Sequence, residues 1–303
     1  MKAVLILGSE GFIGNHLARY FVLNGFTVYG CDLFETSRHG GYNYFKVSRL
    51  SPEWEEIFTK QDFGFCINAA GSGSVSYSMT HPLLDFEANT LDTARVLDAI
   101  RRFNTSCKYL HISSAAVYGN PEKLPVEEDD RKSPLSPYGW NKLMAELVCR
   151  EYSVVYGLST AIIRPFSVFG RGLRKQLLWD ICVKLQANDS INLFGTGNES
   201  RDFIHISDLT TVVDKVLMHS PFNCDVYNTA TGTETSIRRI ADIFEQNFPG
   251  QKRIFFSGTE KKGDPVNWRS DVSKLSKLGF APTVRFEDGV IDYINWYRSL
   301  NNE

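Results

Sequence analysis

The sequence predicts an α/β protein with a doubly wound parallel sheet and a smaller C-terminal α/β lobe. Two observations indicate the sheet: apolar runs of strand length alternate with amphipathic stretches through the first half of the chain, and these runs are unbroken. Such runs are typical of strands that helices bury on both faces. The second lobe is predicted by a change after about Arg164, where the elements become shorter and Gly-rich turns appear.

Strands and helices alternate along the first half of the sequence, as a doubly wound sheet requires. Amphipathic stretches between the apolar runs predict helices, and a proline opens two of them. The predicted strands are Ala3–Leu7, Thr27–Cys31, Phe63–Asn68, Cys107–Ile112 and Ser159–Ile163, and the predicted helices are Phe12–Asn24, Pro82–Phe103 and Pro137–Tyr156. We therefore expect one lobe over residues 1–165 and a second over residues 166–303, with some C-terminal segments returning to the first.

Composition places the chain among ordinary globular proteins. Of its 303 residues 43% are hydrophobic, and a formal net charge of -2 supplies no global basic field for nucleic acid or an anionic membrane. The six cysteines lack a Cys-x-x-Cys spacing and suit buried positions in a reducing compartment. The apolar run after Met1 is too short for a signal peptide or a membrane span. We expect a cytoplasmic protein that binds no nucleic acid, no membrane and no metal.

A glycine-rich turn, Gly8-Ser9-Glu10-Gly11-Phe12-Ile13-Gly14, follows the first predicted strand and leads into a helix. Glycines here let the backbone approach a pyrophosphate, whose charge the helix N-terminus stabilises. Asp32 follows the second strand, about 20 residues after the turn, where an acidic side chain accepts hydrogen bonds from the adenosine ribose. Because a carboxylate there repels a 2′-phosphate, the pattern favours NAD over NADP in a Rossmann-type domain. The alternative is a strand–helix turn with a surface aspartate.

Small residues end the third predicted strand, in the segment Asn68-Ala69-Ala70-Gly71. The carboxyl ends of parallel strands line the crevice in which a doubly wound sheet binds its ligand, so small residues here would admit a cofactor. An ordinary exit from a strand into a loop has the same composition.

A tyrosine and a lysine lie four residues apart in Tyr138-Gly139-Trp140-Asn141-Lys142, at the start of the helix that Pro137 opens. This spacing puts both side chains on one helix face, so the ammonium can approach the phenol oxygen. A nearby cation favours the phenolate of a tyrosine, which is otherwise a poor base at neutral pH. The spacing alone is weak evidence, because Tyr42 and Lys46 repeat it in an extended-looking stretch after the second strand.

A serine-rich segment from Ser113 through Gly119 follows the strand Cys107–Ile112 and distinguishes Tyr138 from Tyr42. A hydroxyl at this strand end could share a proton with Tyr138 and orient a substrate hydroxyl. The alternative is that these serines only cap a turn.

Together these motifs resemble the extended short-chain dehydrogenase/reductase superfamily and, within it, the NAD-dependent sugar epimerase/dehydratase family of the UDP-glucose 4-epimerase type. The resemblance covers nearly the whole chain. It is carried by the glycine turn, Asp32, Ala69-Ala70, Pro82 through Asn89, Ser114 through Gly119, Tyr138-x-x-x-Lys142, Arg164-Pro165, Gly195-Thr196-Gly197 and Arg201-Asp202-Phe203-Ile204-His205.

The resemblance implies a role for each matching residue. Tyr138 would be the acid/base, Lys142 would bind the nicotinamide ribose and lower the tyrosine pKa, and Ser114 would assist at the sugar 4-hydroxyl. The implied NAD-binding residues are Gly8, Gly11, Phe12, Ile13, Gly14, Asp32, Leu33, Ala69, Ala70, Gly71, Asn89, Ile112, Tyr138, Lys142 and Pro165. The residues implied to bind a nucleotide-diphosphate sugar are Ser114, Tyr138, Ser167, Arg201 and Lys261. The implied assembly is a homodimer formed by the helices Pro82–Phe103 and Pro137–Tyr156.

Three positions depart from the family pattern: Ser167 stands where asparagine is usual, Lys261 where arginine is frequent, and Asp92 where glycine is frequent. The first two leave the nucleotide base and the sugar open. Arg201 would contact the diphosphate, which suits a guanidinium, and the alternative is a solvated surface arginine. His205, within an apolar run, is predicted to be a structural histidine with satisfied hydrogen bonds.

The residues after Ser114 separate the reactions of the family. Dehydratases resemble one another in an Asp-Glu pair at this place, and decarboxylases keep a glutamate, because elimination needs extra acid/base groups. This chain has Ala115 and Ala116 there, which predicts an epimerase that acts at C4 through a transient 4-keto-sugar. The alternatives are a keto-sugar reductase, a 4,6-dehydratase and, outside the enzymes, an NAD-sensing regulatory protein, against which the intact Ser114, Tyr138 and Lys142 argue.

Overall fold

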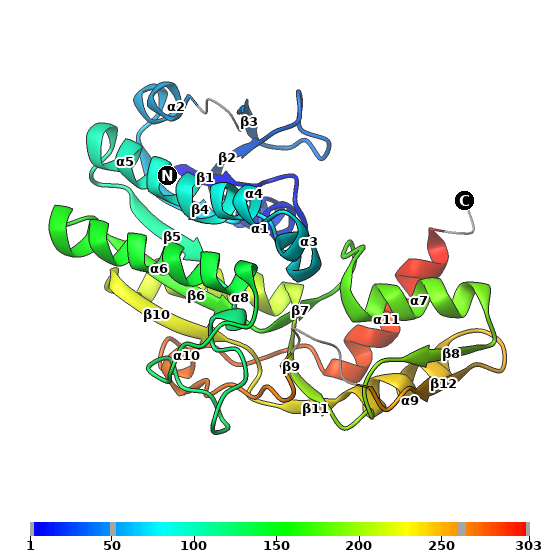
Figure 1. Ribbon diagram of the computed structural model, residues 1–303. Coiled ribbons are helices and arrows are strands. Elements are labelled where there is room, and N and C mark those ends of the chain that lie inside the picture. Colours follow the sequence, from blue (N-terminus) through cyan, green and yellow to red (C-terminus); the bar gives the residue numbers. More distant parts are fainter. Residues whose placement is uncertain (1–2, 49–52, 260–264, 301–303) are drawn as a thin grey trace.

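The computed structural model describes residues 3–48, 53–259 and 265–300. Its largest element is a seven-stranded sheet in which all neighbouring strands are parallel, in the order β10-β6-β5-β4-β1-β2-β3 (Figure 1). The strands are β1 (Ala3–Leu7), β2 (Thr27–Asp32), β3 (Asn43–Lys46), β4 (Phe63–Asn68), β5 (Lys108–Ile112), β6 (Thr160–Pro165) and β10 (Asn223–Thr229). The predicted α/β class with a Rossmann-type parallel sheet is confirmed.

Helices bury both faces of this sheet, which explains why its strands are apolar without alternation. On one face α1 (Phe12–Leu23) and α8 (Ile206–His219) share a core with Val4 and Ile6 of β1. On the other face α2 (Trp54–Lys60), α5 (Asp92–Phe103) and α6 (Pro137–Tyr156) share a core with Leu5 and Leu7. Successive residues of β1 therefore point to opposite layers, as the pleat of a strand dictates.

The strand order reverses between β1 and β4, which is where such a sheet binds its ligand. The turn at Gly8 follows β1, and Ala69 and Ala70 follow β4, so the two segments meet at this reversal. Gly8 has a φ of +76°, and a Cβ there would lie 2.8 Å from the Cα of Ala70. Only glycine lets the two strand exits approach this closely.

The residues predicted to form the second lobe, 166–303, contain a separate hydrophobic core, formed largely by helices and by β8 and β12. Three strands form one small sheet in the order β11-β9-β7, and two strands, β12 and β8, form another. The strands are β7 (Ser167–Phe169), β8 (Ser190–Leu193), β9 (Ser200–His205), β11 (Glu234–Ser236) and β12 (Arg253–Phe256), and the helices are α7 (Gln176–Ala187), α9 (Ile237–Asn247) and α11 (Phe286–Ser299). In Figure 1 these elements lie together beyond the carboxyl end of β6.

Two features differ from the sequence expectation. The single helix expected over Pro82–Phe103 is divided into α4 (Pro82–Phe86), a π-helical turn (Glu87–Leu91) and α5. The other helices of the described ranges were not predicted: α2, α7, α8, α9 and α11, and the short α3 (Val75–Thr80) and α10 (Ser273–Ser276). Among the helices of the described ranges, none is both long and apolar enough to cross a membrane.

Candidate functional site

The first turn of α1 is suited to bind phosphate. Gly11 is the N-cap residue, no side chain caps the helix, and its first turn carries no acidic residue. The free N–H groups at a helix start and the positive end of its dipole attract a phosphate. A Cβ on Gly14 would lie 2.0 Å from the carbonyl oxygen of Gly8, so only glycine lets α1 start this close to β1. Gly8, Gly11, Phe12, Ile13 and Gly14 thus form a cradle that fits the pyrophosphate of a dinucleotide.

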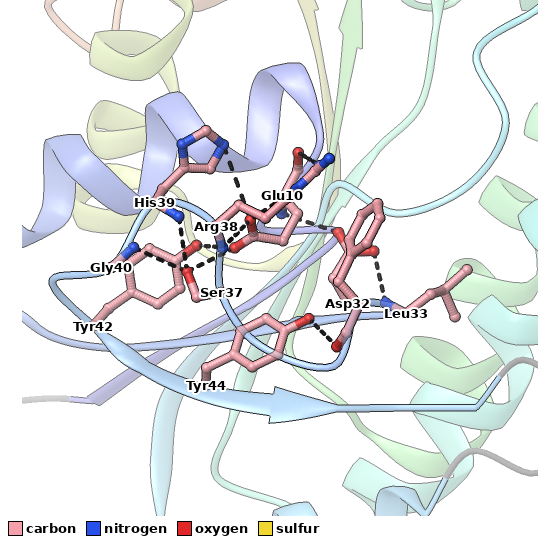
Figure 2. Close-up of polar contacts among 10 residues, drawn as sticks. Glu10, Asp32, Leu33, Ser37, Arg38, His39, Gly40, Tyr42 and Tyr44 are labelled. Atoms are coloured by element: carbon pink, nitrogen blue, oxygen red, sulfur yellow. Dashed lines mark hydrogen bonds and ion pairs between the residues drawn. The ribbon is translucent and has the colours of Figure 1, made fainter.

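Asp32 lies beside this cradle at the end of β2. Its Oδ2 accepts a hydrogen bond from the backbone N–H of Glu10 at 3.0 Å, and its Oδ1 accepts one from Leu33 N–H at 2.7 Å (Figure 2). Each carboxylate oxygen can accept a further hydrogen bond, so the group is held in place and can still bind ribose hydroxyls. The arrangement fits an adenosine ribose without a 2′-phosphate.

Gly71, after β4, lies against Asn89 of the π-helical turn, and Ala69 and Ala70 lie against Gly8. Gly71 has a φ of +112°, and a Cβ there would lie 2.5 Å from Oδ1 of Asn89. Asn89 is buried, its Nδ2 donates to the carbonyl of Asp85 at 3.0 Å, and its Oδ1 has no hydrogen-bond partner among the described residues. An unpaired buried acceptor of this kind, in a π-helical turn, is typical of a functional site.

Tyr138 and Ser114 come together from α6 and from the end of β5. Ser136 caps α6 by accepting from Gly139 N–H at 3.3 Å, which places Tyr138 in the first turn. The Ser114 hydroxyl lies close enough to the phenol of Tyr138 to lower its pKa. Ser114 also caps a short 3-10 turn, since its Oγ accepts from Ala116 N–H at 3.1 Å. The neighbouring Ser113 faces away, because its hydroxyl donates to the buried Oε1 of Glu146 at 2.5 Å.

Lys142 is buried one turn along α6, and its Nζ donates to the carbonyl of Ile112 at 3.0 Å. Burial lowers the pKa of Lys142 to about 8, although Asp85 and Glu146 oppose this shift. Burial also raises the pKa of Tyr138 above its ordinary value, against the opposing effect of the Ser114 hydroxyl. The expected lowering of the tyrosine pKa by Lys142 is therefore wrong for this structure, because desolvation of the phenol dominates and the ammonium is bound to a carbonyl.

Asp85 is a buried acid that the sequence analysis missed. It is 0% exposed, and its Oδ2 accepts from Nδ2 of Asn141 at 2.7 Å. Its Oδ1 has no hydrogen-bond partner within the described part of the chain. The charge of Asp85 raises the pKa of both Tyr138 and Lys142. Asp85 lies three residues after Pro82, and an acidic residue in the first turn of a helix is usually exposed. The sequence therefore did not indicate that Asp85 is buried.

Arg164 connects the site to the interior of the sheet. Its Nε and Nη2 donate to the two carboxylate oxygens of Glu146 at 2.9 and 2.7 Å, and its Nη1 donates to the hydroxyl of Tyr118 at 2.6 Å. Arg164 and Glu146 are both buried. Since Glu146 also binds Ser113, this network fixes β6, α6 and the segment after β5 relative to one another.

The residues implied for the sugar nucleotide lie mainly in the second lobe. Pro165 ends β6 and the half-buried Ser167 begins β7. Arg201, in β9, donates from Nη1 to the carbonyls of Ser200 at 2.8 Å and Val266 at 3.1 Å, and its guanidinium lies 5.6 Å from the ring centre of Trp268. Lys261 lies outside the described residues.

His205 is structural, but its hydrogen bonds are only partly satisfied. Its Nδ1 accepts from Ser207 N–H at 3.3 Å and caps α8, whereas its buried Nε2 has no partner in residues 3–48, 53–259 and 265–300. The expectation of a fully satisfied histidine is wrong at this nitrogen. Within the same ranges no group of three or more His, Cys, Asp or Glu side chains is placed to hold a metal ion.

Comparison with known proteins gives a consistent result. The sequence profile of the NAD dependent epimerase/dehydratase family matches residues 4–230. The chain is 27% identical over 306 residues to a putative UDP-glucose 4-epimerase of Methanocaldococcus jannaschii, covering 98% of this chain and 99% of that protein. Its fold is similar to that of the UDP-N-acetylglucosamine 4-epimerase from Methanobrevibacter ruminantium M1, with a TM-score of 0.88, 24% identity and 99% of each chain covered. TunA, an NAD dependent NDP-hexosamine 5,6-dehydratase, has a TM-score of 0.88 and 25% identity, covering 99% of this chain and 98% of its own.

Proposed function

The chain belongs to the NAD dependent epimerase/dehydratase family, and from that premise we propose that it is a nucleotide-sugar epimerase that inverts C4 through a transient 4-keto-sugar. The observation that carries the proposal is the proximity of Ser114 to Tyr138, whose pKa the serine hydroxyl lowers, together with Ala115 and Ala116 after the serine. The pair can move one proton between a tyrosine and a sugar hydroxyl. The two alanines supply no second acid/base group, which elimination of water would need.

NAD, when bound, supplies the reversible oxidation of the sugar carbinol. The chain's own residues then have to manage the proton of the 4-hydroxyl. We assign Tyr138 as the base that takes this proton and as the acid that returns it, and Ser114 as the hydroxyl that orients the sugar oxygen and shares the proton. We assign Lys142 to the nicotinamide ribose, whose hydroxyls its ammonium would bind.

The remaining assignments follow from position. The glycine cradle would hold the pyrophosphate, Asp32 and Leu33 the adenosine ribose, and the small residues after β4 would admit the dinucleotide. Asn89, Ile112 and Pro165 would line the nicotinamide end. Ser167, Arg201 and Lys261 would bind the nucleotide diphosphate and the sugar, and we propose that residues 166–303 form this substrate lobe apart from β10 and α8, which pack with residues 1–165.

The main competing activity is dehydration, and the similarity to TunA gives it a specific basis. Against it, Ala115 is fully buried and Ala116 is partly buried, and neither methyl group can transfer a proton. Asp85 is the carboxylate whose charge acts on Tyr138, but it is buried and bound to Asn141 rather than open to a sugar. The relatives named 4-epimerases point to the same reaction.

The test is to incubate the protein with UDP-, dTDP-, GDP- and CDP-hexoses in deuterated water and to follow the products by NMR and mass spectrometry. Epimerisation at C4 predicts two sugars at equilibrium, equal mass and no solvent deuterium at C5. A 4-keto-6-deoxy product that carries solvent deuterium would replace the epimerase by a dehydratase. Stoichiometric consumption of NADH with a supplied keto-sugar would indicate a reductase, and no turnover of any sugar would favour a regulatory protein.

We also propose a homodimer formed through α6 and through the segment Pro82–Phe103, which comprises α4, the π-helical turn and α5. Trp140, Leu147 and Val154 are spaced seven residues apart on one face of α6, and these residues are 51%, 56% and 76% exposed. A seven-residue apolar repeat on a surface helix is the pattern of a helix that packs against a partner helix. Light scattering after size exclusion should give twice the mass of the chain, and Leu147→Asp with Val154→Asp should give the monomer.

A further inference from the structure

Glu10 is a buried carboxylate inside the glycine turn, and none of the assignments above uses its side chain. The side chain is 0% exposed. Its Oε1 accepts from the hydroxyls of Tyr42 at 2.5 Å and Ser37 at 2.9 Å, and its Oε2 accepts from Arg38 N–H at 2.9 Å (Figure 2). Burial opposes ionisation, but these three hydrogen bonds outweigh it and lower the pKa of Glu10 below its ordinary value. The group is therefore a carboxylate at neutral pH.

These bonds join the cofactor cradle to the loop between β2 and β3. The backbone N–H of Glu10 donates to Asp32. Its side chain accepts hydrogen bonds from three residues of the segment that leads to β3, namely Ser37, Arg38 and Tyr42. The loop is held from its other side by Tyr44, whose hydroxyl donates to the carbonyl of Phe34 at 2.8 Å. The segment beside the ribose-binding Asp32 is thus fixed before any ligand arrives, which reduces the entropy lost on binding.

Arg38 is the cation closest to this carboxylate. Its Nε lies 3.6 Å from Oε2 of Glu10, and its Nη2 donates to the carbonyl of Glu10 at 3.2 Å. Its guanidinium also lies 3.8 Å from the ring centre of Phe34. His39 adds a second basic side chain, with Nε2 at 3.9 Å from Oε2 of Glu10. The other charged pair of the loop, Glu35 with Lys46, is exposed and neutral overall.

An arginine at this place has a known chemical use. A guanidinium next to the adenosine ribose can accommodate the 2′-phosphate of NADP in a Rossmann-type site. The side chain of Arg38 carries the positive charge that a phosphate needs and is 54% exposed, but it forms an ion pair with the buried carboxylate of Glu10. The adenosine ribose site is then bordered by the negatively charged Asp32 and by an Arg38 whose charge is already paired. Both features disfavour binding of a 2′-phosphate.

We propose that Glu10 is a second determinant of cofactor choice: it anchors the loop of residues 33–42 beside the adenosine ribose and pairs with Arg38, so that this guanidinium does not serve the 2′-phosphate of NADP. Asp32 repels the phosphate directly. Glu10 acts indirectly, because its carboxylate pairs with the cation that would otherwise attract the phosphate.

The experiment measures which dinucleotide the protein retains, without any sugar turnover. Protein is incubated with NAD and NADP in known ratios, free nucleotide is removed, and the bound nucleotides are released and counted by mass spectrometry. Glu10→Gln keeps the shape and most hydrogen bonds but removes the charge, and it should raise the bound NADP:NAD ratio by about two- to fivefold, the effect of one ion pair with a half-exposed partner. Tyr42→Phe keeps the charge of Glu10 but removes one hydrogen bond of the loop anchor, so it separates the two roles: its ratio should stay closer to that of the wild type than the ratio of Glu10→Gln.

Two further variants make the result specific to Arg38. In Glu10→Gln with Arg38→Ala the gain should disappear, since the released guanidinium is gone. Arg38→Ala alone, at an exposed position that should not disturb folding, should leave the ratio unchanged, because a paired arginine contributes nothing to the phosphate. The proposal is overturned if Glu10→Gln leaves the ratio unchanged, if the gain persists in the double variant, or if Arg38→Ala alone lowers the ratio.

Discussion

Asp85→Asn tests how the site controls its protons. The change replaces a buried carboxylate by a neutral side chain of the same shape. Asp85 binds Asn141 through Oδ2, and an amide oxygen can accept the same hydrogen bond. The variant therefore removes one negative charge and keeps the contact between α4 and α6.

The size of the effect follows from the two pKa values that Asp85 raises. The pKa of Lys142 is about 8, after burial has lowered it and Asp85 and Glu146 have opposed the fall. Asp85 also adds to the burial that raises the pKa of Tyr138. Removing a charge in close range shifts a pKa by about one unit or more, and one unit is ~1.4 kcal/mol. Both pKa values should fall, so the whole pH profile of turnover should move about one unit toward acid.

The assay is the rate of sugar interconversion between pH 5.5 and 10 at constant ionic strength. On the acid limb Asp85→Asn should be faster than the wild type, and on the alkaline limb it should be slower. The matched control is Asp189→Asn, which neutralises an aspartate of the second lobe whose side chain is 87% exposed, and its profile should coincide with the wild type. A profile of Asp85→Asn that superimposes on the wild type, or that is reduced equally at every pH, refutes the reasoning.

Three further predictions concern the acid/base, the buried ion pair and the cofactor. Tyr138→Phe should lower turnover about 10²- to 10⁴-fold with bound NAD retained, whereas Tyr42→Phe should stay near wild type, and equal losses would contradict the catalytic assignment. Glu146→Ala leaves the buried Arg164 without its counter-ion and should lower the free energy of unfolding by ~3–5 kcal/mol in urea denaturation. Glu146→Leu with Arg164→Met should recover most of that loss, and additive losses would argue against a coupled pair. Purified protein should release NAD on denaturation, and a predominance of NADP would contradict the assignment of Asp32.

The strands of the large sheet could be predicted because burial on both faces leaves a local signature. All five residues of β1 are buried, and its predicted bounds match the structure. β3 is a half-exposed edge strand and shows only as an extended stretch around Tyr42 and Lys46. β10 joins the sheet beside β6 only after the chain has passed through β7, α7, β8, β9 and α8. That pairing is set by long-range packing, which no local pattern carries.

The residues of the candidate site also fall into two groups, those that a local sequence motif identifies and those that it does not. The glycine turn, Asp32, Ser114, Tyr138 and Lys142 belong to short motifs with a fixed spacing, so the sequence could point to them. Asp85 and Glu10 could not be found, because what matters about them is burial among partners that are remote in sequence. Asn141 is 56 residues from Asp85, and Tyr42 is 32 residues from Glu10. An acidic side chain in a first helical turn or a glycine loop reads as exposed until those partners are known.

The π-helical turn explains how the motif residues and the hidden ones form one site. A π-helical turn inserts an extra residue into a helix, which changes the direction in which the following side chains point. Here Asp85 precedes the turn and Thr90 lies within it, yet both bind Asn141: Asp85 through its carboxylate, and Thr90 by donating its hydroxyl to the Asn141 carbonyl at 2.9 Å. Asn141 stands between Tyr138 and Lys142 in α6. The orientation of the acid/base pair therefore depends on a second helix that the Tyr-x-x-x-Lys motif does not include, and a change in that helix can alter turnover while the motif stays intact.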